Sequence, residues 1–374
     1  MTEIYVIRHA QAEGNLYRVM QGHWDGGVTA LGFAQIDALA ERFKAVEIDA
    51  VYSSDLYRAC ATASAITRYH ALPLVTDREL REINVGPLET QFFGDMLYRY
   101  PENMAQFMYD PEHWTLEGAE TYSDVRERGY NCLRRIADAN PGKTLAVVSH
   151  GVTIRAMISG VTGISLNDKM NLPAFGNTSV TKLRYDGGVF AVEYMNDASH
   201  LDGLTPSWPR TDSLRCEYID PAKEHKWYTH CYADAWKTAH GSLCSFNART
   251  YLNSAIKHYE HYPRAVMKLY NADEPVGLVD LDTERYAQDG IGWVSLLYLA
   301  EEYRGKGYGA QALGRAVFAY RALGRKFLRL QVAGENENAV RFYLRFGFKT
   351  VSEQTTSLGT LLTMEKSLEE KKDV

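Results

Sequence analysis

The sequence predicts an α/β protein of two domains: first a three-layer α/β/α sandwich with a mostly parallel sheet, then a mixed α/β fold. Its 374 residues exceed what one hydrophobic core usually holds. Strand-like and helix-like segments alternate, as they do in sheets that helices cover on both faces. Periodicity breaks over residues 199–212, where two prolines and a glycine mark a linker. We expect domains at residues 1–198 and 213–368, and a solvated tail at 369–374.

Hydrophobic periodicity orders the elements of the first domain. The expected strands are residues 3–8, 50–53, 72–75, 144–149, 179–185 and 189–195. The expected helices are residues 30–44, 56–69, 122–138 and 152–159. The last two strands form a hairpin, because the segment Asp186-Gly187-Gly188 between them is a turn sequence.

The second domain restarts the pattern with two helices before its strands. The expected helices are residues 222–238, 248–261, 307–323 and 336–346. The expected strands are residues 265–270, 275–282, 291–299 and 327–332, followed by closing strands. This order predicts a mixed sheet.

Composition and charge narrow the classes of partner and compartment. A net charge of −6 gives no reason to expect nucleic acid, so we expect small-molecule partners. Five cysteines without a CxxC pair are typical of a reduced, cytoplasmic protein, and a nucleophilic role for Cys231 or Cys244 is the weaker alternative. The N-terminus does not resemble a signal peptide, and no apolar stretch approaches the roughly 18 residues of a membrane span. The oligomeric state is not predicted.

Two histidines each follow a hydrophobic, strand-like run. His9 comes after Arg8 at the end of one run, and His150 stands between Ser149 and Gly151 at the end of another. Because the carboxyl ends of strands in an open parallel sheet border the ligand crevice, we expect both imidazoles at one site. A neutral imidazole can attack a phosphoryl group while cations hold its oxygens. His9 with Arg8 would supply the nucleophile and a clamp, and His150 a second donor.

Two further residues suit the same chemistry. Arg58 lies in the first turn of the predicted helix 56–69, where a guanidinium beside backbone N–H groups makes a good anion site. Glu82 follows the strand at 72–75 in a loop and is a candidate general acid for the leaving oxygen. The set predicts a site that handles phosphate.

These residues resemble the motifs of the histidine phosphatase superfamily, in its phosphoglycerate-mutase-like branch. The family's Arg-His-Gly motif, helix arginine, acid and second histidine correspond to Arg8-His9-Ala10, Arg58, Glu82 and His150. Its first loop and first helix correspond to Asn15, Gln21-Gly22 and Thr29-Ala30-Leu31-Gly32. The resemblance covers about residues 1–197 and implies a phosphohistidine intermediate on His9 without a cofactor. The residues implied to bind phosphate are Arg8, Asn15, Arg58, His150 and Gly151.

The match departs from the family at three places. Ala10 replaces the usual glycine, so we expect a methyl group close to the phosphate and a tight but usable pocket. The segment 25–29 lacks a proline, and 86–90 keeps only part of a Gly-x-Trp-Glu-Gly motif, so the substrate-facing wall can differ. The longer insertion of true glycerate mutases is not evident after Glu82, which favours a phosphatase over a mutase.

A glycine-rich turn follows the expected strand 291–299 and precedes a helix. Its sequence is Arg304-Gly305-Lys306-Gly307-Tyr308-Gly309. Glycines let a backbone approach an anion closely, and the helix N-terminus adds partial positive charge. A Rossmann fingerprint does not fit, because the turn does not open a βαβ unit, and a Walker A motif lacks its Gly-Lys-Ser/Thr. The turn therefore predicts a pyrophosphate site of another kind.

Together with a downstream helix, the turn resembles the GNAT N-acetyltransferases over about residues 213–368. The family's Arg/Gln-x-x-Gly-x-Gly/Ala turn matches Arg304, Gly307 and Gly309. Its Asn-x-x-Ala-x-x-x-Tyr helix and Gly-Phe ending match Asn336, Ala339, Tyr343, Gly347 and Phe348. The resemblance implies acetyl-CoA as the cofactor, with its pyrophosphate on the amides of residues 304–309.

The same resemblance implies roles for other residues of the second domain. The pantetheine arm would lie along Leu297 to Leu299, Tyr343 would protonate the departing thiolate and Asn336 would contact the cofactor. Ser295 stands where the family often has a glutamate base, so Asp280 or Asp282 is the alternative base. The acetyl acceptor would be an amine of a small molecule or peptide.

Two more histidines, His258 and His261, are expected on a solvated helix face rather than in a metal site. No metal site is predicted in either domain.

We therefore predict a bifunctional enzyme that hydrolyses a small phosphomonoester and transfers acetyl from acetyl-CoA to an amine. A phosphomutase is one alternative for the first domain. A CoA-sensing regulatory domain without turnover is the alternative for the second. The loops at 87–120 and 222–262 show no pattern that identifies either substrate. That both domains act on one molecule or pathway is a hypothesis.

Overall fold

The computed structural model describes residues 1–204 and 212–369. The middle of the predicted linker 199–212 and nearly all of the predicted tail 369–374 lie outside the described residues. The described chain forms two compact units: residues 1–91 with 96–204, and residues 92–95 with 212–369.

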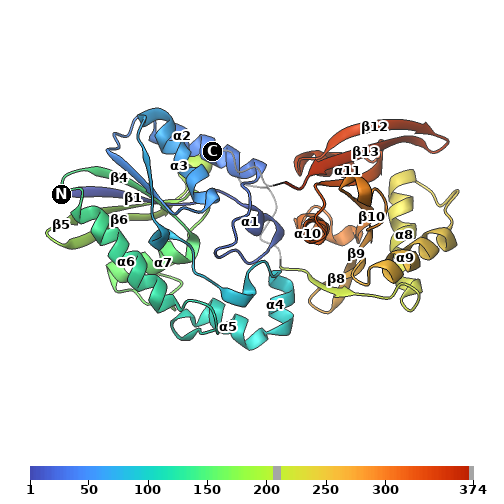
Figure 1. The fold of residues 1–374 in the computed structure, drawn as a ribbon, viewed down its shortest axis with the longest axis horizontal. Helices are drawn as coiled ribbons and strands as arrows, with labels where there is room; N and C mark the ends of the chain where they lie inside the picture. The colour runs from blue at the N-terminus through green and yellow to red at the C-terminus, as the bar shows by residue number, and fades with distance from the viewer. Residues whose placement is uncertain (205–211, 370–374) are drawn as a thin grey trace. The chain divides into compact units, whose positions relative to one another are not determined.

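The first unit is built on a six-stranded sheet of order β3-β2-β4-β1-β5-β6 (Figure 1). Its strands are β1 (Thr2–Arg8), β2 (Ala50–Ser53), β3 (Leu74–Thr76), β4 (Thr144–Ser149), β5 (Val180–Asp186) and β6 (Val189–Asp197). The four strands from β3 to β1 are parallel, whereas β5 and β6 add an antiparallel hairpin. The predicted, mostly parallel sheet is confirmed.

Helices cover both faces of this sheet (Figure 1). The helices between β1 and β5 are α1 (Glu13–Tyr17), α2 (Ala30–Phe43), α3 (Tyr57–His70), α4 (Phe93–Arg99), α5 (Pro101–Tyr109), α6 (Tyr122–Asp138) and α7 (Gly151–Thr162). On one face, Leu39 and Phe43 of α2 and Ile66 of α3 form a buried cluster with Val51 and Val148 of the sheet. The helices α6 and α7 lie on the other face, which gives the predicted three layers.

Periodicity missed three helices of this unit. The helices α1, α4 and α5 have 5, 7 and 9 residues, too few turns for a clear 3.6-residue repeat. Pro101 at the first position of α5 was the available local signal, since proline favours that position.

The second unit is built on a seven-stranded sheet of order β12-β13-β11-β10-β9-β8-β7. Its strands are β7 (Arg215–Tyr218), β8 (Val266–Asn271), β9 (Glu274–Asp282), β10 (Ile291–Leu299), β11 (Phe327–Ala333), β12 (Lys349–Thr356) and β13 (Gly359–Ser367). Its helices are α8 (His225–His240), α9 (Ala248–His261), α10 (Tyr308–Ala322) and α11 (Glu337–Arg345). Only β10 and β11 pair in parallel, so the predicted mixed sheet is confirmed. The four-residue strand β7 was not predicted.

The parallel pair β10–β11 holds together at one end only. Residues 291–294 of β10 pair with residues 327–330 of β11, and the register of β10 against β9 shifts between Val294 and Leu296. Beyond this bulge, β10 continues to pair with β9 but no longer with β11. The two strands therefore separate toward their carboxyl ends. No helix within the described ranges has the length and apolar character needed to cross a membrane.

The start of α2 offers a test of close packing in the first unit. A Cβ atom on Gly32 would lie 2.2 Å from the carbonyl oxygen of Gln11 and 2.7 Å from Cγ1 of Val28. Helix propensity alone favours alanine over glycine, but the backbone oxygen cannot move aside cheaply. We expect Gly32→Ala to lower the free energy of unfolding by about 2 kcal/mol, measured by denaturant unfolding.

Gly27→Ala is the matched control, because a Cβ there meets nothing within 4 Å. It should change stability by less than about 0.5 kcal/mol. A stabilised Gly32→Ala variant would contradict this packing.

Candidate active sites

The parallel pairing of β1 with β4 brings two distant histidines together. Arg8 is opposite Ser149 in the register, and the N–H of His9 donates to the carbonyl of Ser149 at 2.9 Å. His9 and His150 are the next residues of their chains, so both leave the sheet at the same edge. Their ring centroids lie 5.1 Å apart, and both side chains are buried.

The hydrogen bonds of His9 define its tautomer. Its Nδ1 lies 2.7 Å from the carbonyl oxygen of Ala10, which can only accept, so Nδ1 carries the proton. Burial, and then the positive charges of Arg58 and Arg8, hold the pKa of His9 well below its ordinary value. The ring is therefore neutral, and its Nε2 has a free lone pair. This is the form that a nucleophilic imidazole needs.

His150 has the opposite tautomer. Nε of Arg58 donates to its Nδ1 at 3.2 Å, so the proton of the neutral ring is on Nε2. Burial, followed by the charge of Arg58, lowers the pKa of His150 far below its usual range. Its Nε2 is buried and has no hydrogen-bond partner among the described residues. A lone donor thus lies beside the lone pair of His9, as a bound anion would require.

Arg58, the second residue of α3, is completely buried. Its Nη1 donates to the carbonyl of Trp24 at 2.9 Å and its Nη2 to that of Gly22 at 2.7 Å, while Asp25 lies 3.7 Å away. Burial lowers its pKa to about 10, so it remains positive at neutral pH. A guanidinium has five N–H groups, so two remain available to an anion.

The carboxylate of Glu82 lies at the N-terminus of α7. Its Oε1 accepts from the N–H of Thr153 at 3.0 Å, and its Oε2 accepts from the N–H of Val152 at 3.2 Å. The hydroxyl of Thr153 and the N–H of Ile83 also donate to Oε1. Oε2 has only this one donor among the described residues.

The remaining predicted phosphate residues surround the same edge. Arg8 donates to the carbonyl of Phe175, and a Cβ on Gly151 would lie 3.2 Å from the guanidinium carbon of Arg8. The glycine thus allows this guanidinium to pack against the first turn of α7. The side-chain oxygen of Asn15 accepts from Ala12 N–H, which leaves its Nδ2 as a donor.

The structure corrects the expectation for Ala10. Its methyl group belongs to the buried hydrophobic cluster under α2 and α3, and its N–H donates to the hydroxyl of Thr62 at 2.8 Å. The side chain is therefore part of the core, because the chain turns inward immediately after His9.

Asn177 was not predicted from the sequence. Its Nδ2 donates to the carbonyl of His9 at 2.9 Å and to the side-chain oxygen of Asn15 at 3.3 Å. It holds both residues in place from 168 and 162 positions away. No local pattern could have identified it.

The five cysteines are all free. Burial raises the pKa of Cys231, which disfavours it as a nucleophile. Among the described residues, Asp77, Glu79 and Cys132 offer possible metal-ligand atoms within 4.8 Å of one another. Arg135 donates to both carboxylates of this group, at 2.6 and 3.2 Å, so a cationic side chain already lies against them.

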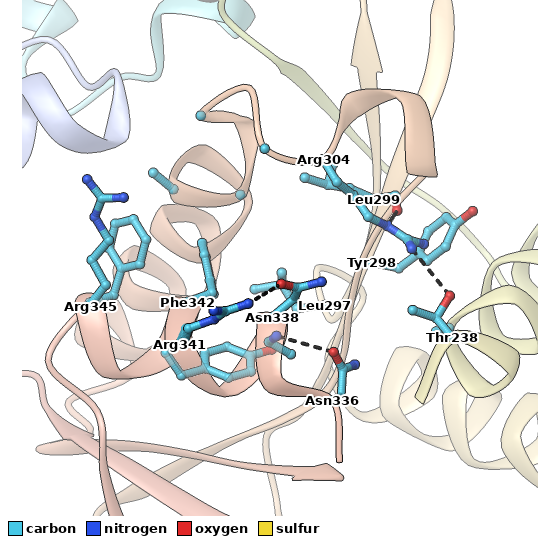
Figure 2. Close-up of a pocket in the computed structure, with 18 residues that line it drawn as sticks. Thr238, Leu297, Tyr298, Leu299, Arg304, Asn336, Asn338, Arg341, Phe342 and Arg345 are labelled. Atoms are coloured by element: carbon cyan, nitrogen blue, oxygen red, sulfur yellow. Dashed lines mark hydrogen bonds between the residues drawn. The ribbon is translucent and has the colours of Figure 1, made fainter. Parts of the chain in front are cut away.

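The second unit contains a pocket of about 680 Å³ where β10 and β11 separate (Figure 2). Its walls come from β10, the glycine turn, α8 and α11. The predicted residues that line it are Leu297, Leu299, Arg304, Gly305, Gly307, Gly309, Asn336 and Tyr343. Gly305 and Gly307 have φ values of 72° and 92°, in the left-handed region that favours glycine.

The backbone of the glycine turn is available to a ligand. No described backbone carbonyl accepts from the N–H groups of residues 305–309, and α10 begins at Tyr308. The side chains of the turn behave differently. The ring of Tyr308 is buried, Lys306 lies over the ring of Tyr303 at 5.9 Å, and neither lines the pocket.

Arg304, the first residue of the turn motif, forms hydrogen bonds to β10 and α8. Its Nε donates to the carbonyl of Leu299 at 2.7 Å and its Nη1 to the hydroxyl of Thr238 at 3.3 Å (Figure 2). Its Nη2 donates to Asp234 at 3.0 Å. Its charge is therefore matched by a carboxylate of α8.

Two of the predicted residues that line the pocket, Asn336 and Tyr343, belong to the α11 segment. Burial raises the pKa of Tyr343, so its hydroxyl keeps its proton at neutral pH. Asn336 caps α11 by accepting from the N–H of Ala339 at 3.2 Å, which leaves its amino group facing outward from the cap.

The structure corrects the expectation for His258, which is not on a solvated face. Its side chain is 12% exposed, with Nδ1 at 2.8 Å from Asp280 and Nε2 at 3.4 Å from Asp282. Burial opposes its charge, but the bonds to the two carboxylates outweigh burial and raise its pKa to about 9. Asp280 also accepts from the hydroxyl of Tyr228 at 2.7 Å, and neither aspartate lines the pocket. His261 is half exposed, as expected.

Comparison with known families identifies both domains. Residues 4–198 match the histidine phosphatase superfamily (branch 1), and residues 223–348 match the acetyltransferase (GNAT) family. The first match covers more than half of the chain. The protein belongs to the histidine phosphatase superfamily and carries a GNAT acetyltransferase domain in the same chain. Both domains are of enzyme families, and GNAT domains generally use acetyl-CoA.

Similar proteins extend over little more than half of the chain. "Putative phosphoserine phosphatase 2" of Hydrogenobacter thermophilus is 30% identical over 205 residues, which are 55% of this chain and 100% of that protein. Phosphoglycerate mutase-like protein 4 of Arabidopsis thaliana is 32% identical over 204 residues, 54% of this chain and 87% of that protein. The structure of Bacillus stearothermophilus YhfR is 30% identical with a TM-score of 0.52, covering 54% of this chain and all of that structure.

Because His9 and His150 are both buried and neutral, we expect the free energy of unfolding to fall as the pH falls. Above pH 6.5 the rings are neutral in both the folded and unfolded states, so they do not make the free energy of unfolding depend on pH. Below 6.5 the unfolded state binds protons that folded His9 and His150 refuse, so stability falls with pH until their lowered pKa values are reached. Each ring should contribute about 1.4 kcal/mol per pH unit.

Urea unfolding between pH 7 and 5 measures this loss. His150→Gln should reduce the slope by about the contribution of one histidine. His113→Gln, at a histidine that is 75% exposed, is the control and should leave the slope steep. An unchanged slope in His150→Gln would show that this ring is charged in the folded protein.

Proposed function

We propose that the chain is a bifunctional enzyme: a phosphomonoesterase that works through a phosphohistidine on His9, and an acetyl-CoA-dependent amine acetyltransferase. One observation carries the first half. A neutral His9 with a free Nε2 lone pair lies 5.1 Å, between ring centroids, from a neutral His150 whose buried Nε2–H has no described partner. This pair offers a nucleophile and a donor to the same small anion.

The phosphatase reaction divides into two displacements. Nε2 of His9 attacks phosphorus, the bond from phosphorus to the ester oxygen breaks, and protonated Glu82 gives its proton to the leaving alcohol. Water then attacks the phosphohistidine, and the Glu82 carboxylate takes a proton from that water. Inorganic phosphate leaves and His9 is restored.

Four groups would hold the phosphoryl oxygens through both steps. Arg58 and Arg8 supply charge, His150 supplies Nε2–H and Asn15 supplies Nδ2–H. Gly151 allows Arg8 to lie close to the N-terminus of α7, whose partial positive charge adds to the attraction. Asn177 is a positioning residue, since it acts through His9 and Asn15.

A small phosphorylated metabolite is the substrate class we propose. The relatives include one named for phosphoserine hydrolysis and one named for likeness to phosphoglycerate mutases, so O-phosphoserine and 3-phosphoglycerate belong in the first panel. We favour hydrolysis over phosphoryl isomerisation, because the chain lacks an evident mutase-like insertion after Glu82.

The nucleophile is tested by release of inorganic phosphate from that panel. His9→Ala should lower kcat/KM at least about 1,000-fold, because no other group can form the covalent intermediate. The exposed His113→Ala, in the same unit, should keep full activity. Acid-labile, base-stable ³²P on the wild-type chain identifies the intermediate. Equal phosphate release by wild type and His9→Ala would refute the assignment, and isomer formation without phosphate would favour the mutase.

The pocket of the second unit supports acetyl-CoA as the acetyl donor. A pyrophosphate fits the free N–H groups of residues 305–309 at the start of α10. An extended amide-bearing arm fits beside Leu297 and Leu299, where β10 has no partner on the β11 side. Acetyl-CoA, when bound, supplies the acetyl group and a thiolate leaving group. Asn336 offers an amide donor at the pocket wall.

Tyr343 is the acid that we propose for the thiolate. Its buried hydroxyl keeps its proton, so the side chain can hold it ready at Oη. No carboxylate or histidine is among the described residues that line the pocket. This observation favours the second candidate, a domain that binds CoA as a sensor without turnover.

Thiol release from acetyl-CoA with an amine panel separates the two candidates. We expect wild-type turnover, and we expect Tyr343→Phe to lower kcat about 10- to 100-fold with little change in KM, since the hydroxyl acts on the leaving group. Tyr218→Phe, at a tyrosine 48% exposed in the same unit, is the control. Tight CoA binding with no thiol release from any amine would support the sensor instead.

A further inference from the structure

His200 lies inside the predicted linker, yet its side chain packs into the first unit. It belongs to the short 3₁₀ helix η4 (Ser199–Leu201) and is partly buried. Nη1 of Arg42, in the last turn of α2, lies 3.2 Å from its Nδ1. A guanidinium can only donate, so Nδ1 accepts and the proton of the neutral ring is on Nε2. Burial, followed by the charge of Arg42, lowers the pKa of His200 to about 4, which keeps the ring neutral.

The guanidinium of Arg42 is itself held in one orientation. Its Nη2 donates to a carboxylate oxygen of Asp197 at 2.7 Å and to the hydroxyl of Tyr194 at 3.3 Å. Its Nη1 also donates to the carbonyl of Asp197 at 3.3 Å. Because these acceptors fix the guanidinium, its bond to Nδ1 fixes the direction of the imidazole ring of His200.

The opposite edge of this ring meets a buried threonine. Nε2 of His200 lies 3.2 Å from the hydroxyl oxygen of Thr178, and since Nε2 carries the proton, it donates to that oxygen. Thr178 is completely buried and has a φ value of 53°, in the left-handed region. β-Branched residues rarely adopt this conformation, which persists only where the surrounding structure holds it. The bond from His200 is one such constraint.

Thr178 in turn contacts the backbone of the phosphatase site. Its N–H lies 3.0 Å from the carbonyl oxygen of Arg8 and 3.4 Å from that of His9, and donates to both. Its neighbour Asn177 donates to the same carbonyl of His9 at 2.9 Å. A shift of Thr178 would therefore move the backbone that carries the proposed nucleophile.

We propose that His200 is a positioning residue of the phosphatase site, which acts through Thr178 to fix the backbone of His9 and the direction from which its Nε2 attacks phosphorus. The inference rests on the proposed role of His9 as the nucleophile. Misplacement of a reacting group by about 1 Å can slow a reaction about 100-fold. Loss of His200 should therefore slow the attack. It should change phosphate binding little, because Arg58 and His150 hold the phosphoryl oxygens from other elements.

Single-turnover release of p-nitrophenolate from p-nitrophenyl phosphate, measured by stopped flow, reads this attack directly. Nε2 of His9 bonds to phosphorus as the bond to the aryl oxygen breaks, and this weakly basic leaving group needs no proton from Glu82. His200→Leu should lower the limiting rate about 10- to 100-fold and change the half-saturating concentration less than about threefold.

Two further variants separate positioning from folding. Thr178→Val removes the acceptor but keeps the size and branching of the side chain, so it should slow the attack as His200→Leu does, and it carries the test if His200→Leu does not fold. The double variant should be no slower than either single variant, because both break the same bond. His200→Gln, whose amide can donate to Thr178, should restore the rate to within about threefold of wild type.

His70→Leu is the matched control. His70 is also partly buried, and its Nε2 lies 3.1 Å from the carbonyl oxygen of Phe43, away from this path. It should keep the wild-type rate.

Equal rates for wild type and His200→Leu would overturn the positioning role but leave His9 as the nucleophile. The same holds if His200→Gln is as slow as His200→Leu, or if His70→Leu slows the attack equally. If wild type releases neither p-nitrophenolate nor phosphate from the metabolite panel, the proposed phosphatase function itself is wrong.

Discussion

The parallel register of β1 on β4 is the constraint on which the phosphatase site depends. Because Arg8 is opposite Ser149, the residues that follow, His9 and His150, leave the sheet side by side. A slip of one residue would turn one of these side chains to the other face and separate the rings. The pairing also delivers Arg8 and the N-terminus of α7 to the same edge, where Glu82 caps the helix.

Burial then sets the protonation states of the two histidines. In water both histidines would be partly protonated near neutral pH, and a protonated imidazole cannot attack phosphorus. Desolvation and the charge of Arg58 keep both rings neutral. The hydrogen-bond partners at Nδ1 place the proton on Nδ1 of His9 and on Nε2 of His150. The same low dielectric strengthens the attraction of the two guanidinium groups for a phosphate. The proposed nucleophile, donor and phosphate-binding arginines thus lie in one buried cluster.

In the second unit, a change of strand pairing makes the pocket. The strands β10 and β11 are joined over residues 291–294 and separate after the bulge at Ser295. Because the two strands are paired at one end and apart at the other, a slot lies between them that continued pairing would have closed. Hydrogen bonds of Arg304 connect the carboxyl end of β10 to α8. The glycine turn follows at the end of the slot where the two strands are apart. The N–H groups of residues 305–309 have no described backbone acceptor there, which supports the proposed pyrophosphate site.

The sequence by itself determined the two α/β architectures, because strand and helix periods are local. It also predicted His9, Arg58, Glu82, His150 and the glycine turn as site residues, because each stands at a strand end or helix start. It could not show that Ala10 packs in the core or that Asp280 and Asp282 enclose His258, since those environments arise from packing. Tertiary structure alone placed Asn177 against His9 and Asn15, paired Arg304 with Asp234 and assigned the histidine protons. Tautomer, charge state and side-chain direction depend on burial and on partners that, for Asn177 and His9, lie 168 positions apart, and no local pattern carries that information.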